Sequence, residues 1–561
     1  MEYADLVVVY RRLESTESNI EKTRIVAETL ESAGEEELER LVKLLQGNLF
    51  AERESEELGV SSSLTRSAIT RATGIDEDTI EDWWRETGDL GSAAERAKRE
   101  ERQQSLVSER LTVEQVHRTL RSLATFEGSG SQSRRVDEIA GLLSNAEPEE
   151  AKYLVRTTLG QLRIGVGSGT IRDAIATAFL DGGDDASAAV ERALQVTNDF
   201  GRVATVARER GTDGLEELDV ELFRPIRVML AEKAESIEDG IDAVADRPEA
   251  VLAEYKYDGV RVQIHVDGAD VAVFTRRLEE VTEQFPDVVS AVRTHLDVES
   301  AILEGELLGY DPETHDVYPF QTLSRRIKRK YDIEEMAEEI PVVCYLFDLV
   351  YVGGESILDS RLETRIDRLT EALDSEDWTI ERATHRRNAD RESIQSFYED
   401  ALSAGHEGIM LKNLEAAYQP GRRVGYMMKV KPTLESLDLV VVRAKYSEGR
   451  RRNQLGRLYL GARDEATGDF REVGRLSTGF TDEELAEVTE RLESRIIDRD
   501  GREVVFDPGV VLEVEFEEIQ ESPEYDSGYA LRFPRFVDFR DDVGLGGVDT
   551  VDRIESLYES Q

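Results

Sequence analysis

The spacing of apolar residues changes along this chain, and that change limits its possible folds more than any other feature. In residues 1–220 apolar side chains recur every three or four positions, as at Val136, Ile139 and Leu143, a spacing typical of amphipathic helices. Within residues 260–266 the period is two instead, which indicates a half-buried strand. A purely helical chain and a purely β chain are therefore both excluded.

The chain is long enough for several domains, since 561 residues at ~100–200 per domain suggest three or four. We predict three: an all-α domain in residues 1–220, a mixed α/β domain in residues 221–435 and a small β-barrel in residues 436–561. In the barrel we expect strands within 437–442, 458–460 and 510–516, and a helix over 481–497. Pro148 suits the first turn of a helix, and the helical apolar pattern after it continues to Leu162.

Acidic residues dominate the composition. The chain has 119 Asp and Glu against 70 Lys and Arg, a net charge of −49, whereas an ordinary nucleic-acid binder shows a basic footprint. The 40% hydrophobic content argues against a chain kept unfolded by its charge. Only 12 of the basic residues are lysines, and this acid-rich, lysine-poor composition resembles proteins of salt-loving archaea. The alternative is a Ca²⁺-buffering protein or one that avoids acidic substrates, but no Asp/Gly calcium loop appears.

The single cysteine, Cys344, excludes a disulfide framework and a cysteine-based zinc site within one chain. Residues 1–10 lack the features of a secretion signal, and no stretch approaches the ~18 apolar residues of a membrane span. We therefore expect a cytoplasmic protein with no membrane partner. The six histidines show no metal-ligand spacing, so we assign none of them to a site.

The segment Glu254-Tyr-Lys-Tyr-Asp-Gly-Val-Arg261 allows two interpretations. Asp-Gly between alternating apolar residues is a strong hairpin signal. The functional interpretation starts from Lys256, because a lysine amine becomes a nucleophile once burial or nearby cations lower its pKa. Arg261 could then supply positive charge and bind phosphate oxygens.

Three later segments place acids, lysines or both on expected strands. In Ile302–Leu307 the alternation places Glu304 and Glu306 on one face, where two carboxylates repel unless a cation or hydroxyl meets them. The segment 407–412 begins with a glutamate and ends with a lysine, and the segment 427–431 places its two lysines on one face. With Lys256, four of the 12 lysines therefore lie in these motifs, which a random surface distribution does not explain.

Together these segments resemble the motif series of the covalent nucleotidyltransferases, and within that superfamily the ATP-dependent DNA ligases of archaea and eukaryotes. The motifs, in chain order, are Lys256-Tyr-Asp-Gly-Val-Arg261, Thr275-Arg-Arg277, Glu304-Gly-Glu306, Tyr345-Leu-Phe-Asp348, Glu407-Gly-Ile-Met-Leu-Lys412 and Met428-Lys-Val-Lys431. The resemblance extends to both ends, because residues 150–165 are similar to the ligase DNA-binding domain and residues 531–536 to the final ligase motif. It implies an all-α DNA-binding domain, an ATP-grasp-like adenylation domain and an OB-fold barrel.

The resemblance also implies a reaction. Lys256 would attack the α-phosphate of ATP and hold AMP, which would pass to the 5′-phosphate of nicked double-stranded DNA before the 3′-hydroxyl displaces it. Mg²⁺ would neutralise charge on the phosphates. The implied contacts are Glu407 with the metal, Glu254 and Phe347 with adenine, Glu306 with the ribose, Arg261 and Arg276 with sugar and phosphate, Arg423 within the nucleotide pocket, and Lys429 with the α-phosphate. We expect a monomer that acts in replication, recombination and repair.

Some of these positions have simpler explanations. Phe347 lies in an apolar run and without its motif would be a core residue, and Glu304 is expected to be structural. Arg276 and Arg277 point to opposite faces if they lie on a strand, so only one of them can reach the nucleotide.

The chain also departs from the family. Asp538 and Val543 stand where the final motif usually has basic residues, and Met427 stands where an aromatic residue is expected. Residues 103–107 lie where a sliding-clamp box could occur, but they lack aromatic anchors, so a surface helix is favoured.

Other functions fit less well. An RNA ligase or a capping guanylyltransferase would share the lysine motifs but would not need a helical DNA-binding domain. An NAD-dependent ligase would need a four-cysteine zinc module, which one cysteine excludes. A catalytically dead DNA scaffold would not need to keep Lys256 with its partner residues.

Overall fold

A computed structural model describes residues 1–50, 58–101, 109–327, 329, 331–421, 425–432, 436–447 and 454–559. Its contacts divide the chain into two compact units, Met1–Lys431 and Pro432–Gln561. Each unit has hydrophobic core clusters of its own. Among the described residues, the helices are too short or too polar to cross a bilayer.

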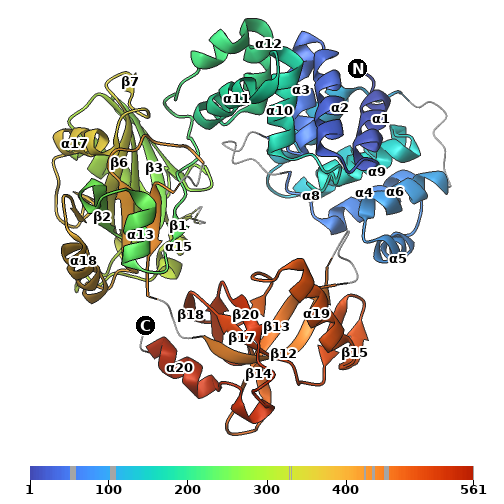
Figure 1. The fold of residues 1–561 in the computed structure, drawn as a ribbon. Coiled ribbons are helices and arrows are strands. Elements are labelled where there is room, and N and C mark those ends of the chain that lie inside the picture. The colour runs from blue at the N-terminus through green and yellow to red at the C-terminus, as the bar shows by residue number, and fades with distance from the viewer. Residues whose placement is uncertain are drawn as a thin grey trace. The chain divides into compact units, whose positions relative to one another are not determined.

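The first part of unit 1 is helical, coloured blue to green in Figure 1. Several helices begin at a side chain that accepts a hydrogen bond from a backbone N–H of the first turn, as at Ser18, Ser61 and Thr112. The helices are α1 (Tyr3–Glu14), α2 (Asn19–Glu31), α3 (Leu38–Gln46), α4 (Ser62–Thr73), α5 (Glu77–Thr87), α6 (Leu90–Arg99), α7 (Val113–Ser122), α8 (Ser131–Asn145), α9 (Pro148–Thr158), α10 (Ser168–Phe179), α11 (Gly183–Thr197) and α12 (Phe200–Glu216).

Helix α9 begins at Pro148, as the sequence predicts. Its end differs from the prediction, because the helix stops at Thr158 although the apolar pattern continues to Leu162. Gly160 adopts a φ of +64°, a left-handed conformation that a helix cannot continue through.

A buried ion-pair cluster connects three of these helices. Asp89 accepts hydrogen bonds from the N–H groups of Gly91 and Ser92 at the start of α6, and Nη2 of Arg156 in α9 donates to it at 2.7 Å. Arg156 also donates to Glu14 at the end of α1 at 3.1 Å. The cluster therefore holds α1, α6 and α9 together.

Two sheets form the second part of unit 1. The first has the order β1-β11-β10-β2-β9, and the second has the order β4-β3-β5-β6-β7, with β8 also paired to β6. The strands are β1 (Glu232–Lys233), β2 (Val251–Tyr255), β3 (Val260–Asp267), β4 (Asp270–Thr275), β5 (Ser300–Gly309), β6 (Val342–Val352), β7 (Glu355–Ser356), β8 (Ile380–Arg382), β9 (His385–Arg386), β10 (Ile409–Asn413) and β11 (Met427–Val430). Residues 256–259 connect the two sheets.

Helices cover these sheets (Figure 1). Apolar residues of β2, β10, α13 and α18 share one core cluster, and those of β3, β5, β6 and α14 share another. The helices are α13 (Ile237–Val244), α14 (Pro286–His295), α15 (Phe320–Ile327), α16 (Ile333–Glu339), α17 (Leu362–Ala372) and α18 (Arg391–Ser403).

Unit 2 is built around an antiparallel sheet. Strands β14, β13, β12, β17 and β20 pair in that order, and an isolated bridge between Thr478 and Arg535 joins the two ends of the series into a ring. The elements are β12 (Leu437–Tyr446), β13 (Leu455–Arg463), β14 (Phe470–Leu476), α19 (Asp482–Glu493), β15 (Ile496–Asp500), β16 (Glu503–Phe506), β17 (Val511–Glu515), β18 (Glu518–Glu521), β19 (Tyr529–Arg532), β20 (Arg535–Phe539) and α20 (Val551–Glu559). The predicted helix over 481–497 is shorter in the structure, because residues 496–500 form β15.

Candidate active site

Lys256 lies directly after β2, in the connection between the two sheets. Its backbone N–H donates to the carbonyl of Gly408 at 2.9 Å, and the N–H of Glu407 donates to the carbonyl of Lys256 at 3.1 Å. These bonds extend the antiparallel β2–β10 ladder. The Lys256 amine and the Glu407 carboxylate form an ion pair, so the ladder places the two groups opposite each other.

Glycine at position 408 permits this approach of the strands. Gly408 has a φ of +136°, and a Cβ there would lie 2.2 Å from the carbonyl oxygen of Val430. A Cβ at Gly259 would likewise lie 2.2 Å from the carbonyl oxygen of Leu307. At both motif positions the neighbouring backbone therefore leaves no room for a Cβ, so only glycine fits.

Aromatic rings on both sides of Lys256 anchor its backbone. The ring of Tyr255 stacks on Phe397 of α18, with centroids 4.7 Å apart. The ring of Tyr257 stacks on Tyr345 of β6 at 4.3 Å, with an interplanar angle of 8°. The residues next to the lysine are thus packed against different elements of the α/β part.

The surroundings of Lys256 change its titration. Burial lowers the pKa of the amine to about 8; Lys431 and Lys429 add to this effect, and carboxylates such as Glu306 oppose it. Burial also raises the pKa of Glu306 to about 7, against the effect of nearby cations. A lysine with so low a pKa loses its proton readily and can act as a nucleophile.

Three strands place a row of side chains on one face of the first sheet. Glu254 of β2 is the register partner of Met410 in β10, which in turn pairs with Lys429 in β11. The Glu254 carboxylate is buried and forms an ion pair with Lys412. Burial raises the pKa of Glu254, whereas Lys412 favours its charged form. A charged carboxylate here could accept a hydrogen bond from an exocyclic amine.

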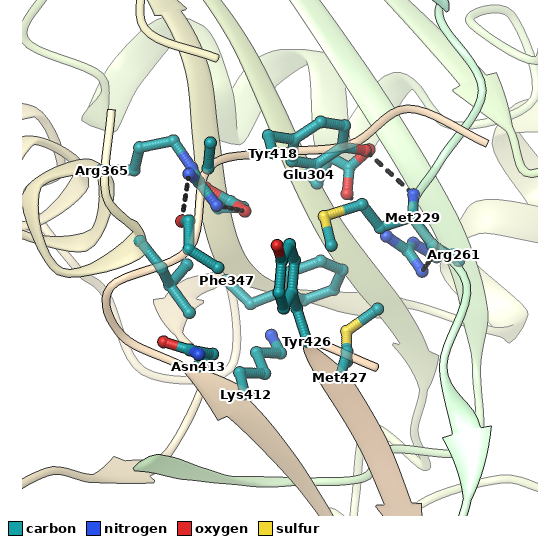
Figure 2. A pocket seen from close by; sticks show the side chains of 14 residues that line it. Met229, Arg261, Glu304, Phe347, Arg365, Lys412, Asn413, Tyr418, Tyr426 and Met427 are labelled. Carbon is teal, nitrogen blue, oxygen red and sulfur yellow. Dashed lines mark hydrogen bonds and ion pairs between the residues drawn. The ribbon is translucent and has the colours of Figure 1, made fainter. Parts of the chain in front are cut away.

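A cavity lies beside this row, and residues of both sheets line it (Figure 2). Phe347 reaches this cavity from a β-bulge, since Glu304 pairs with Asp348 and Gly305 pairs with Leu346, which leaves Phe347 as the extra residue. The lining residues are Met229, Arg261, Glu304, Phe347, Asp348, Leu362, Arg365, Lys412, Asn413, Ala416, Ala417, Tyr418, Tyr426 and Met427.

Two cations lie close to the ring of Phe347. The Lys412 Nζ is 4.4 Å from the ring centroid, and the guanidinium carbon of Arg261 is 5.3 Å from it. An aromatic face with nearby cations suits a ligand that combines a flat ring with phosphate groups.

Comparison with known proteins shows which family has this arrangement. Residues 2–176 match the family described as DNA ligase N terminus, residues 228–431 match the ATP dependent DNA ligase domain, and residues 451–543 match the ATP dependent DNA ligase C terminal region. The chain belongs to the ATP-dependent DNA ligases. The prediction of this family and of an enzyme is thereby confirmed.

Relatives of this ligase match along its full length. The chain is 43% identical to the DNA ligases of Nanoarchaeum equitans and Thermococcus fumicolans, covering 100% of this chain and 99% of each relative. It is 42% identical to the DNA ligase of Methanothermobacter thermautotrophicus, covering 100% and 98%. A solved structure titled Pmar-Lig_PreS3 shares the fold, with a TM-score of 0.58 at 17% identity over 95% of this chain and 99% of that one.

Most of the predicted site residues of the ligase lie close to one another. The β2–β10–β11 ladders bring Lys256 and Glu407 together and align Glu254 with Lys429. In the second sheet Arg261 is the register partner of Glu306, and Arg261 and Phe347 both line the cavity.

The remaining predicted positions either do not line this cavity or fall outside the described residues. Arg276 lies in a turn just past β4, is exposed and does not line the cavity of Figure 2. Arg423 and residues 103–107 lie outside the described residues. In unit 2, Asp538 lies in β20 and Val543 follows that strand.

Sequence reasoning missed two buried residues of the ligase cavity. Tyr418 is 3% exposed and its hydroxyl donates to Glu304. Arg365 of α17 is 2% exposed and donates to both oxygens of Asp348, at 2.8 and 3.1 Å. The acid of the Tyr345–Asp348 motif was the available signal for Arg365, because a buried carboxylate needs a cation.

Proposed function

We propose that this ligase seals nicks in double-stranded DNA through a covalent adenylate on Lys256. The observation that carries the proposal is the partly buried Lys256 amine, which lies opposite Glu407 and has a pKa lowered by desolvation to about 8. The full-length match to archaeal DNA ligases supports it. Replication, recombination and repair are the processes that we propose it serves.

The first step transfers AMP to the enzyme. The neutral Nζ of Lys256 attacks the α-phosphorus of ATP. A P–N bond forms, the bond from the α-phosphorus to the bridging oxygen breaks, and pyrophosphate leaves with that electron pair. The nitrogen, now bonded to phosphorus, releases one of its two protons to solvent. Because the Glu407 carboxylate favours the protonated amine, the ion pair must open before the attack. Lys429, on the same sheet, supplies positive charge to the α-phosphate.

The nucleotide contacts follow from the two sheets. We assign adenine to Glu254 and Phe347, the first by a hydrogen bond and the second by stacking. Glu306 would meet the ribose, and Arg261 would meet ribose or phosphate oxygens. Arg276 would contact sugar and phosphate, and Arg423 would lie within the nucleotide pocket.

The later steps occur on DNA. AMP passes from Lys256 to the 5′-phosphate at the nick, so that a P–O bond replaces the P–N bond. The 3′-hydroxyl then attacks that 5′-phosphate, the phosphodiester forms and AMP leaves. Cations around the reacting phosphates stabilise the charge of each transition state.

Mg²⁺ fits the carboxylate beside Lys256. Among the described residues, no group of three or more His, Cys, Asp or Glu side chains forms a metal cage. Mg²⁺ usually binds through one or two carboxylates together with substrate phosphates, so Glu407 would hold it from the protein side. When bound, the ion would neutralise charge that develops on the phosphates.

We assign one task to each predicted domain. Residues 1–220 would bind DNA, residues 221–435 would form the ATP-grasp-like adenylation domain, and residues 436–561 would form an OB-fold. The ring of five strands in unit 2 supports the last assignment, because OB-folds are five-stranded barrels. We further propose that the enzyme acts as a monomer.

An adenylation assay tests the proposal. Protein incubated with ATP labelled at the α-phosphate should keep the label after denaturation, whereas a γ-phosphate label should be lost. Lys256→Ala should keep neither label but should still seal a nick that already carries AMP. Lys445→Ala, which changes a lysine of unit 2, is the control and should adenylate normally. Label retention by Lys256→Ala would contradict the proposal.

A further inference from the structure

Tyr418 lies in the loop between β10 and β11 and is almost fully buried. Its hydroxyl donates to the Glu304 carboxylate and accepts the backbone N–H of Met229 at 3.3 Å. Burial and the charge of Glu304 raise the pKa of the Tyr418 hydroxyl, so the group keeps its proton and stays a donor. Tyr418 therefore connects this loop to β5 and to the segment before α13.

The Glu304 carboxylate accepts hydrogen bonds from side chains of different elements. Its Oε1 accepts from the Tyr418 hydroxyl and from Nε2 of Gln263 at 3.3 Å, and its Oε2 accepts from Nη2 of Arg261 at 2.6 Å. The side chain is fully buried. A buried carboxylate with one cation and two neutral donors has little freedom to turn, so it fixes the cation that it binds.

Arg261 is held on two sides, and one of its buried nitrogens lacks a partner among the described residues. Its Nη1 donates to the carbonyl of Met229 at 3.0 Å, and its Nη2 donates to Glu304. Its Nε is buried and has no hydrogen-bond partner among the described residues. A buried N–H without an acceptor is unfavourable, and a ligand oxygen would satisfy it.

The backbone of Met229 is also held by both groups. Its N–H donates to Tyr418 and its carbonyl accepts from Arg261, so loss of the Tyr418 hydroxyl would remove one hydrogen bond from Glu304 and one from Met229 at the same time. Figure 2 shows Tyr418, Glu304, Met229 and Arg261 at one side of the cavity. Both anchors of the Arg261 guanidinium thus share the Tyr418 hydroxyl as a hydrogen-bond partner.

We infer that Tyr418 is a positioning residue for ATP: by holding Glu304 and Met229, it fixes the Arg261 guanidinium and leaves its Nε–H for an oxygen of the ribose or of a phosphate. This inference rests on the proposed function, in which Arg261 contacts the nucleotide. It assigns no contact between Tyr418 and ATP itself.

The variant Tyr418→Phe removes only the hydroxyl and keeps the ring, which lies near the Arg365 guanidinium. We expect kcat/KM for ATP in self-adenylation to fall about ten- to a hundredfold, the effect of losing a hydrogen bond to a charged group. The loss should appear mainly as a higher KM for ATP. Tyr10→Phe is the matched control, because the buried Tyr10 hydroxyl donates to the carbonyl of Leu44 at 3.0 Å in the helical part. It should change the melting temperature but not the KM for ATP.

A double-mutant cycle with Arg261→Gln separates positioning from stability. If Tyr418 acts through Arg261, Tyr418→Phe should have almost no further effect on ATP in the Arg261→Gln background. Affinity for an unreactive α,β-methylene analogue of ATP provides the same comparison where adenylation is too slow to measure. Equal losses in both backgrounds, or an effect no larger than that of Tyr10→Phe, would overturn the inference. Absence of any lysyl-AMP in the unmodified enzyme would instead reject the proposed function on which it rests.

Discussion

The pKa of Lys256 sets a pH dependence at the scale of a single residue. Only the neutral amine attacks, so the rate of self-adenylation should rise about tenfold per pH unit below a pKa of about 8 and level off above it. Single-turnover adenylation measured across this range checks the prediction. A midpoint near the ordinary lysine value of 10.5 would mean that the reacting amine is not buried.

A neighbouring lysine provides a sharper version of this experiment. Lys431 lowers the pKa of Lys256, so Lys431→Met should move the midpoint of the pH profile upward. Lys445→Met in unit 2 is the control and should leave the midpoint unchanged. An unchanged midpoint in both variants would show that Lys431 does not influence the pKa of Lys256.

The charged residues of the short motifs could be recognised in the sequence. The residues that hold them in place in the structure could not. Lys256 and Glu407 stand out in the sequence because the proposed chemistry requires those residue types, and the structure brings them together as an ion pair. Tyr418 supports the same site from an irregular loop, where no periodicity distinguishes it from a surface residue. Phe347 reaches the cavity through a bulge, and strand alternation does not predict a bulge.

At the scale of elements, Asp89 should stabilise the helical part through two roles. It caps α6 and pairs with Arg156, which is 5% exposed. Asp89→Ala should lower the free energy of unfolding by ~3–5 kcal/mol, because it leaves a buried charge without its main partner. Asp76→Ala is the control: this exposed cap of α5 should cost about 1 kcal/mol. Urea unfolding of both variants checks this, and equal losses would mean that the ion pair contributes nothing.

Two arginines of the final motif flank the turn between β19 and β20. Nη1 of Arg532 lies 3.6 Å from Oε2 of Glu518. Arg535 is the first residue of β20 and is exposed. The resemblance to the family leads us to expect that they orient the leaving pyrophosphate, so Arg532→Ala and Arg535→Ala should slow self-adenylation. Sealing of a nick that already carries AMP should be spared, because that reaction releases no pyrophosphate.

Comparison of the two reactions tests this role. Arg553→Ala, in α20, is the control and should leave both reactions unchanged. Equal damage to adenylation and to sealing in the Arg532 and Arg535 variants would show that this turn acts on DNA instead. Because Asp538 and Val543 replace expected basic residues, we expect a strong dependence on these two arginines.

The types of the elements were more predictable than their ends. The change from helical to alternating spacing matches the observed order of helices and sheets in unit 1. The ends of α9 and α19 differ from prediction because local backbone conformation, such as the positive φ of Gly160, stops a helix while the apolar pattern continues. The ring in unit 2 depends on pairing between distant strands, which periodicity does not encode.

For the whole molecule, the charge of −49 predicts a need for salt. In molar KCl the Debye length falls to ~3 Å, so repulsion among the carboxylates is screened. The free energy of unfolding and the sealing activity should therefore both rise with KCl. Circular dichroism and nick sealing across a KCl series check this, with sucrose as a control for a general effect of excluded solutes. Full activity with an unchanged spectrum at ~0.05 M salt would contradict it.

The boundary between the two units, at Lys431 and Pro432, suggests a site for engineering. Each unit has its own core, and the chain crosses between them at this point, immediately after the last motif lysine. A ligase cut there could be supplied as two polypeptides, with a drug-controlled dimerisation module on each new end. Joining of DNA would then be switched on by a small molecule, without any change to the residues that perform the chemistry.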